Sequence, residues 1–166
     1  MRARFRRRKV GDVVPPKQIK PKSLADYFEA LSRIAFEAGL SSRVIEAKWD
    51  DIRRAFHGFD PERVARMTPR AVDKLLDDAR VIRSRSKIEA TIANAETMLE
   101  LDEEHNGFKR YLRSHADFES TVKDLRKRFK FVGDSGAYRF LWIVGEKVPS
   151  YHDWAESHGR TSGRRT

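Results

Sequence analysis

The chain has 166 residues, of which 39% are apolar and 36% are charged, and its formal net charge is +10. This length predicts one ordinary domain and leaves no room for a second enzyme-sized one. The absence of cysteine excludes disulfides, thiolate nucleophiles and cysteine-bound zinc or iron–sulfur sites.

The positive charge is concentrated at the two ends of the chain. Residues 1–22 contain nine basic side chains and one acidic one, and residues 157–166 contain three arginines and no acid. We therefore predict a basic disordered arm over 1–22, a helical domain over 23–156 and a basic tail over 157–166. Flexible cations bind nucleic acid by releasing counterions, although such ends also occur as solubilising tails.

No apolar run is long enough to cross a bilayer, since the longest, Phe140 to Val144, has five residues. The arginine-rich start is followed by Val10 to Pro16, which contains an aspartate and two prolines instead of the apolar stretch of a signal peptide. We expect a soluble, cytoplasmic protein with no membrane partner.

Apolar residues recur at helical spacing from Ser23 onward, and Gly39 marks the end of the first expected helix. Asp60-Pro61 and Thr68-Pro69 each combine a capping residue with a proline, which predicts the start of a helix at both places. Other starts are expected at Ser41 or Ser42, at Ser86 and just before Phe118. No stretch shows the alternation of apolar and polar residues that is typical of a strand. The predicted fold class is therefore all-α, with about seven to nine helices.

The stretch from Lys123 to Gly145 has the outline of a helix-hairpin-helix. A basic amphipathic helix runs into a glycine-containing turn, and an apolar helix follows. Glycines allow close approach of a ligand, and free amides at the start of the second helix suit a phosphate. The alternative is a helical hairpin whose glycines serve only the turn. The DNA-binding candidates are Lys127, Lys130, Val132, Gly133, Ser135 and Gly136.

Several short stretches of the sequence together resemble those of a known protein family. Ala38-Gly39-Leu40-Ser41, Phe59-Asp60-Pro61, Val81-Ile82-Arg83 and Phe129-Lys130-Phe131-Val132-Gly133 follow one another in order and spacing. Over roughly residues 24 to 145 the chain resembles the bacterial DNA-3-methyladenine glycosylase I family. The resemblance implies a helical base-excision repair enzyme that binds duplex DNA, flips a damaged base and hydrolyses its N-glycosidic bond. We expect no cofactor, a monomer, duplex DNA with a damaged base as partner, and association with the nucleoid.

The resemblance also places the base pocket. The family's base-recognition glutamate falls on Ile34, and its tryptophan after the Ala-Gly-Leu-Ser run falls on Ser42. Glu37, three residues after Ile34 on the same helix, is the candidate replacement acid; a solvated surface glutamate is the alternative. Gly39 and Leu40 correspond to the loop that faces the lesion, although a glycine there can simply end the helix.

Asp153 is the second catalytic candidate. In the wider superfamily a catalytic aspartate follows a Gly-x-x-Val-Pro stretch, which here begins at Gly145; the alternative is a helix cap or an exposed acid. Trp49 and Tyr138 are pocket candidates that lie at core-like helical positions. The family's zinc ligands have no counterpart, and the six-residue spacing of His152 and His158 does not suit a helical metal site, so no metal is expected.

Two other functions remain open from the sequence. The chain can be a catalytically inactive helix-hairpin-helix DNA-binding protein, as the apolar residue at position 34 suggests, or a protein-interaction domain whose basic ends contact an acidic partner. A basic cluster, Arg80, Arg83, Arg85 and Lys87, suits either a DNA backbone or a solvated helix start.

Overall fold

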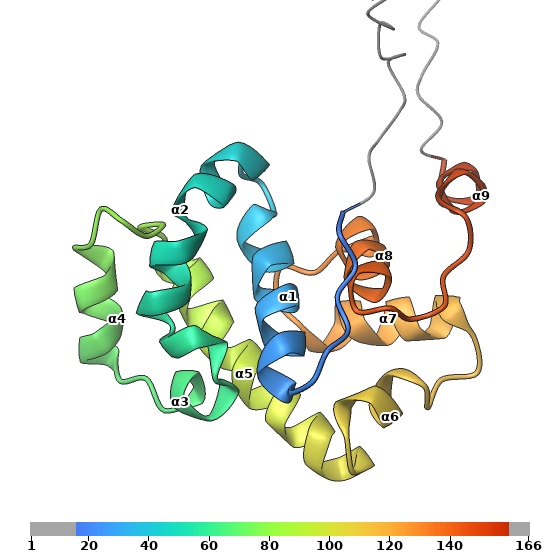
Figure 1. Cartoon of the computed structure of the whole chain (residues 1–166), viewed down its shortest axis with the longest axis horizontal. Helices are drawn as coiled ribbons and strands as arrows, with labels where there is room; N and C mark the ends of the chain where they lie inside the picture. Colours follow the sequence, from blue (N-terminus) through green and yellow to red (C-terminus); the bar gives the residue numbers. More distant parts are fainter. Residues whose placement is uncertain (1–15, 160–166) are drawn as a thin grey trace, which may run out of the picture.

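A computed structural model describes residues 16–159. Within that range the chain forms nine α-helices, one short 3₁₀ turn and no strand, which confirms the all-α prediction (Figure 1). In chain order the elements are α1 (Leu24–Glu37), α2 (Ser42–Ala55), η1 (His57–Phe59), α3 (Pro61–Ala65), α4 (Pro69–Leu76), α5 (Arg85–His105), α6 (Phe108–Leu112), α7 (Phe118–Arg128), α8 (Asp134–Ile143) and α9 (Tyr151–Ser157).

Local capping explains several helix starts. The side chain of Asp60 accepts from the amide of Glu62, and that of Thr68 accepts from the amide of Ala71, so both cap-plus-proline starts are confirmed. Ser23 occupies the cap position of α1, but its side chain makes no capping hydrogen bond. The side chains of Ser84, Asp117 and Ser150 cap α5, α7 and α9 in the same way, so short polar contacts set where these five helices begin.

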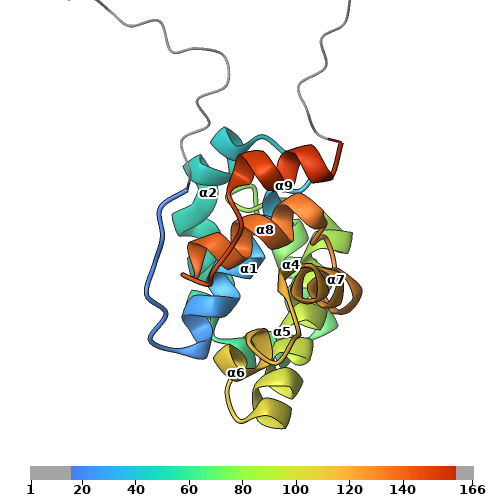
Figure 2. The same ribbon diagram turned by 90° about the vertical axis from the view of Figure 1, so that its right-hand side faces the viewer.

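Helix α5 organises the arrangement, because it contacts α1, α3, α4 and α6. In Figure 1, α2, α3 and α4 lie on one side of the molecule and α7, α8 and α9 on the other. Helix α8 contacts both α1 and α7 (Figure 2). An aromatic group that includes Phe36, Trp49, Phe56 and Phe59 fills the core between α1, α2 and η1.

The structure differs from the predicted N-terminal arm over residues 16–22. This segment is extended and lies against the C-terminal end of α8, where the amide of Ile19 donates to the carbonyl of Ile143 at 2.8 Å. The indole of Trp142 also donates to the carbonyl of Pro16 at 2.9 Å. The positive charge of residues 16–22 predicted disorder, but hydrogen bonds to α8 hold the backbone of this segment in place.

The C-terminal boundary also differs, since α9 extends to Ser157 and the structure continues to Gly159. Helix α9 packs on α8 through Trp154, whose ring centroid lies 4.8 Å from that of Tyr138. The predicted disorder of residues 1–15 and 160–166 lies outside the described residues. Between residues 16 and 159, even α5, the longest helix, lacks the apolar stretch that a membrane span requires.

Asp124, a partly buried carboxylate on α7, links this helix to the chain around α6. Asp124 accepts hydrogen bonds from the hydroxyl of Tyr111 at 2.7 Å and from Arg128 at 3.1 Å, and it lies 3.0 Å from Nε2 of His115. Desolvation works to raise the pKa of Asp124, but these hydrogen bonds outweigh it and hold the pKa below its ordinary value.

Candidate functional site

A cavity of about 450 Å³ opens between α1, α2, α8 and the segment 16–22. Its lining includes Ile34 and Glu37 from α1, Trp49 from α2 and Arg139 from α8. The structure therefore brings together three sequence-predicted pocket residues, and it adds an arginine that the sequence did not single out.

A second cavity, of about 620 Å³, lies between α8, the start of α2 and the chain that leads into α9. Its lining includes Ser42, Ser135 and Tyr138. Pro16 and Arg139 line both cavities, so the two adjoin at these residues. Together they form a concave region on one side of α8.

The acid in this region is Glu37, whose side chain is only 8% exposed. Its Oε1 accepts from Nε of Arg33 at 3.1 Å, one helical turn earlier, and its Oε2 accepts from Nη2 of Arg139. The guanidinium of Arg33 also lies over the Trp49 ring, 5.4 Å from its centroid. Glu37 is thus a buried carboxylate shared by two arginines, and it connects α1 to α8.

Ile34 is buried where α8 packs against α1. A Cβ atom placed on Gly136 would lie 2.8 Å from Cγ2 of Ile34, so the glycine allows the close contact. An apolar side chain at position 34 can pack there, but it cannot accept a hydrogen bond from a base. Gly136, predicted to contact DNA, therefore has a packing role against Ile34.

The connection between α7 and α8 presents an exposed glycine. Gly133 has ordinary backbone angles, and a Cβ atom there would meet nothing within 4 Å. Lys127 and Lys130 are exposed beside it. The negative charge of Asp134, the first residue of α8, is offset by Arg126, 2.9 Å away on α7. This arrangement leaves the turn open and its surroundings basic.

Two side chains of α5 hold this turn in place, and Asn94 is the first. Its Nδ2 donates to the carbonyl of Lys130 at 3.1 Å, and its Oδ1 accepts from the amide of the same residue at 2.8 Å. Because both backbone groups of Lys130 are bonded to one amide side chain, the turn is fixed to α5.

Lys87 is the second side chain of α5 that holds this turn. The sequence suggested an exposed lysine, in contact with DNA or solvent, but the structure buries it. Its Nζ lies 4.8 Å from the centroid of Phe131 and donates to three carbonyl oxygens at the C-terminal end of α1, those of Ala35, Phe36 and Ala38. Desolvation lowers the pKa of Lys87. A cation there satisfies carbonyls that the helix leaves unpaired.

The loop after α1 projects beside these contacts. Gly39 adopts a positive φ of 75°, which ends the helix, and Leu40 is 39% exposed. Because Lys87 binds the last turn of α1 and contacts Phe131, one side chain links this loop to the turn before α8.

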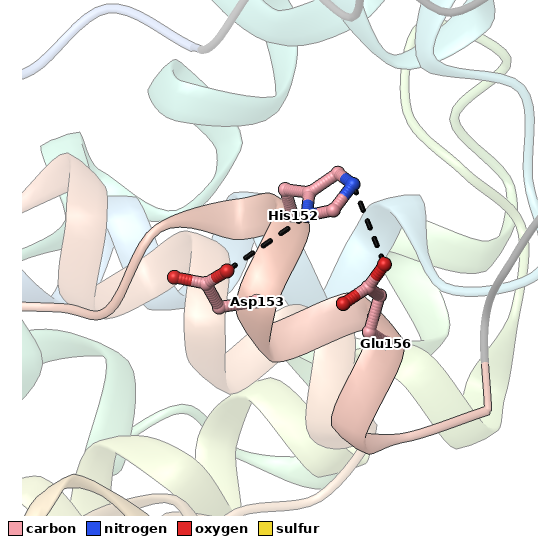
Figure 3. Close-up of side chains that lie close together, drawn as sticks. All are labelled: His152, Asp153 and Glu156. Carbon is pink, nitrogen blue, oxygen red and sulfur yellow. Dashed lines mark ion pairs between the residues drawn. The ribbon is translucent and has the colours of Figure 1, made fainter.

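Asp153 lines neither cavity, although Ser150 and Tyr151, which precede it on the chain, line the second one. It is on α9, its side chain is 78% exposed, and its closest ionic contact is with His152 (Figure 3). His152, Asp153 and Glu156 offer ligand atoms within 4.8 Å of one another, and all three are exposed. The sequence reasoning missed this group because it compared His152 with His158. Without cysteine, the chain does not fit the family's zinc site.

Trp49 and Tyr138 are largely packed in the core. Trp49 stacks on Phe59 at 5.1 Å, and the hydroxyl of Tyr138 donates to the carbonyl of Pro149 at 2.6 Å. Their remaining edges line the first and the second cavity, respectively. Ser42, at the start of α2, is exposed.

The sequence profile of the methyladenine glycosylase family matches residues 20–132, which is more than half of the chain. The chain belongs to the methyladenine glycosylase family. It is similar to DNA-3-methyladenine glycosylase 1 of Escherichia coli strain K12, with 32% identity over 71% of this chain and 74% of that protein.

Solved glycosylase structures share the fold. A variant of 3-methyladenine DNA glycosylase I in complex with 3-methyladenine has a TM-score of 0.68 and 28% identity, covering 78% of this chain and 81% of that one. The 3-methyladenine DNA glycosylase I of Staphylococcus aureus has a TM-score of 0.67 and 25% identity, covering 78% and 80%. The family resemblance predicted from the sequence is confirmed.

Arg139 is a residue of the site that no sequence pattern indicated. It lies 102 residues from Glu37 along the chain, and no local pattern connects the two. The Arg33–Glu37 pair has the i, i+4 spacing of helical ion pairs, so that half of the cluster could have been found.

Proposed function

We propose that this protein is a base-excision DNA repair glycosylase that removes an alkylated base from duplex DNA by hydrolysing its N-glycosidic bond. The observation that carries the proposal is a concave region beside Glu37 and Arg139, flanked by an exposed loop and an exposed glycine turn, in a methyladenine glycosylase fold. The names of the relatives support alkylated purines of the 3-methyladenine type as the substrate class.

The turn between α7 and α8 would hold the DNA backbone as a helix-hairpin-helix. Gly133 is exposed, so a phosphate could approach the amides at the start of α8, near Val132 and Ser135. Lys127 and Lys130 add positive charge nearby, and Arg126 offsets Asp134. Such contacts position the protein without reading the base sequence.

The two cavities would receive the flipped base. Flipping costs a few kcal/mol of stacking and pairing, and a damaged base lowers this cost. The loop of Gly39 and Leu40, whose leucine is exposed, would occupy the space that the base leaves. Edges of Trp49 and Tyr138 provide aromatic surface in the cavities.

Alkylation itself activates the base for cleavage. A purine alkylated at N3 or N7 carries a positive charge in DNA, so the electron pair of the C1′–N bond can pass to the base without prior protonation. Water then adds to C1′ and releases a proton to solvent. The geometry supports Glu37 over Asp153 as the carboxylate of the site, because Glu37 lines the first cavity and binds Arg139, whereas Asp153 lines neither cavity.

We further propose that the protein acts as a monomer, in the cytoplasm and at the nucleoid, where its substrate would lie. No helix in the described range is suited to a membrane.

The test is a release assay on methylated duplex DNA, with free bases separated by chromatography. The proposal predicts enzyme-dependent release of at least one alkylated purine and abasic sites in equal amount. Salt-sensitive duplex binding without release would instead show an inactive DNA-binding protein. Absence of salt-dependent binding once residues 1–15 and 160–166 are removed would favour an interaction domain.

A further inference from the structure

Two aromatic donors that line the second cavity are already engaged. The hydroxyl of Tyr138 donates to the carbonyl of Pro149, and the indole of Trp142 donates to the carbonyl of Pro16. Neither donor is directed to a ligand in this arrangement. A base in the second cavity would therefore meet Arg139 as the charged side chain of the lining.

The carboxylate of Glu37 is engaged as well. Arg33 donates to one of its oxygens and Arg139 to the other, and the side chain is 8% exposed. A carboxylate held by two guanidinium groups is poorly placed to accept a hydrogen bond from the amino group of adenine. Glu37 instead fixes the orientation of Arg139.

Arg139 is the charged group at the junction of the two cavities. It lines both cavities, and its side chain is 41% exposed. A guanidinium has five N–H donors and no acceptor, and the hydrogen bond to Glu37 involves only Nη2. At this junction Arg139 therefore offers a base donors that Glu37 orients, whereas acidic side chains line only the first cavity.

Guanine and adenine differ in what they offer such donors. Guanine has two adjacent acceptors, O6 and N7, which an arginine can bind in bidentate fashion, whereas adenine pairs its N7 acceptor with an amino donor. We propose that Arg139 is a specificity-determining residue that makes N3-alkylated guanine a better substrate than 3-methyladenine. This inference rests on the proposed function. A guanine methylated at N7 has lost one acceptor and should be intermediate.

The experiment compares initial release rates of 3-methylguanine and 3-methyladenine from one preparation of methylated duplex DNA. Rates are corrected for the amount of each base and for spontaneous loss. We expect 3-methylguanine to be released faster by about five-fold or more, the range of a bidentate arginine contact. Arg139→Gln should reverse the preference, because a carboxamide pairs with N6 and N7 of adenine.

Two further variants keep the test decisive. Arg139→Lys retains a cation beside Glu37 but loses the bidentate fork, so the preference should disappear. Arg113→Gln is the matched control, since Arg113 also binds a little-exposed carboxylate, that of Glu146, but lines neither cavity; the preference should be unchanged. Thermal unfolding identifies any variant that fails to fold.

The possible failures are distinguishable. Faster release of 3-methyladenine by the native protein, or a ratio that neither Arg139 variant alters, overturns the role of Arg139 and leaves the glycosylase function intact. Release of no alkylated base at all overturns the proposed function, and this inference with it.

Discussion

The close contact between α1 and α8 predicts how much stability a substitution at Gly136 would cost. In Gly136→Ala, the new Cβ would lie 2.8 Å from Cγ2 of Ile34, about 1 Å inside normal carbon contact. Ile34 is buried and branched at Cβ, so its Cγ2 cannot swing away. Overpacking costs about 1–3 kcal/mol, and a clash this close with a side chain that cannot move costs about 2–3 kcal/mol, whereas the helix propensity of alanine offsets about 1 kcal/mol. We expect a net loss of about 1–2 kcal/mol and a Tm lower by roughly 2–8 °C.

Thermal unfolding followed by circular dichroism measures this effect, and a second substitution tests its cause. Ile34→Leu moves the branch away from Cβ, so it should restore most of the lost Tm in the Gly136→Ala background. Gly133→Ser is the control, because that site has open space and serine is a favourable helix cap. Full stability of Gly136→Ala, or no rescue by leucine, would refute the packing argument.

Three further predictions concern DNA binding, catalysis and pH. Gly133→Asp should weaken binding to duplex DNA by about ten-fold, because it places a negative charge in the proposed phosphate site, while Tm stays within about 2 °C; unchanged affinity, measured by fluorescence anisotropy, would remove the turn from DNA binding. Asp153→Asn should alter the base-release rate by less than about two-fold, as expected for an exposed position, and a large loss would show that α9 reaches the substrate. The lowered pKa of Asp124 contributes stability that is present above the ordinary value of 3.8 and is lost as pH falls through the folded value. The Tm difference between native protein and Asp124→Asn should therefore shrink between pH 7 and pH 3, and a difference that persists at pH 3 would contradict this sign.

The sequence predicted those parts of the structure that local interactions determine. The starts at Asp60 and Thr68 follow from capping side chains and prolines next to them, and the end of α1 follows from the positive φ at Gly39. The all-α class follows from helical spacing along most of the chain. The family followed from short motifs in a fixed order, and the sequence profile confirmed it.

Contacts between distant parts of the chain were not predictable in the same way. Lys87 stands in a basic run that favours exposure, and only the fold places it under the end of α1. Arg139 and Glu37 are joined by the packing of α8 on α1. The segment 16–22 has several lysines, yet its backbone pairs with α8, which composition cannot reveal.

If a base turned out of duplex DNA is cut from its sugar in the cavities beside Glu37 and Arg139, abasic sites must form at the damaged base. The most direct measurement follows abasic-site formation in a duplex with one N3-alkylated purine, against the same duplex undamaged, with native protein and Gly133→Asp in parallel. We expect abasic sites only in the damaged duplex, and slower formation by Gly133→Asp than by the native protein. A damaged duplex that is bound but never converted to an abasic site would contradict it.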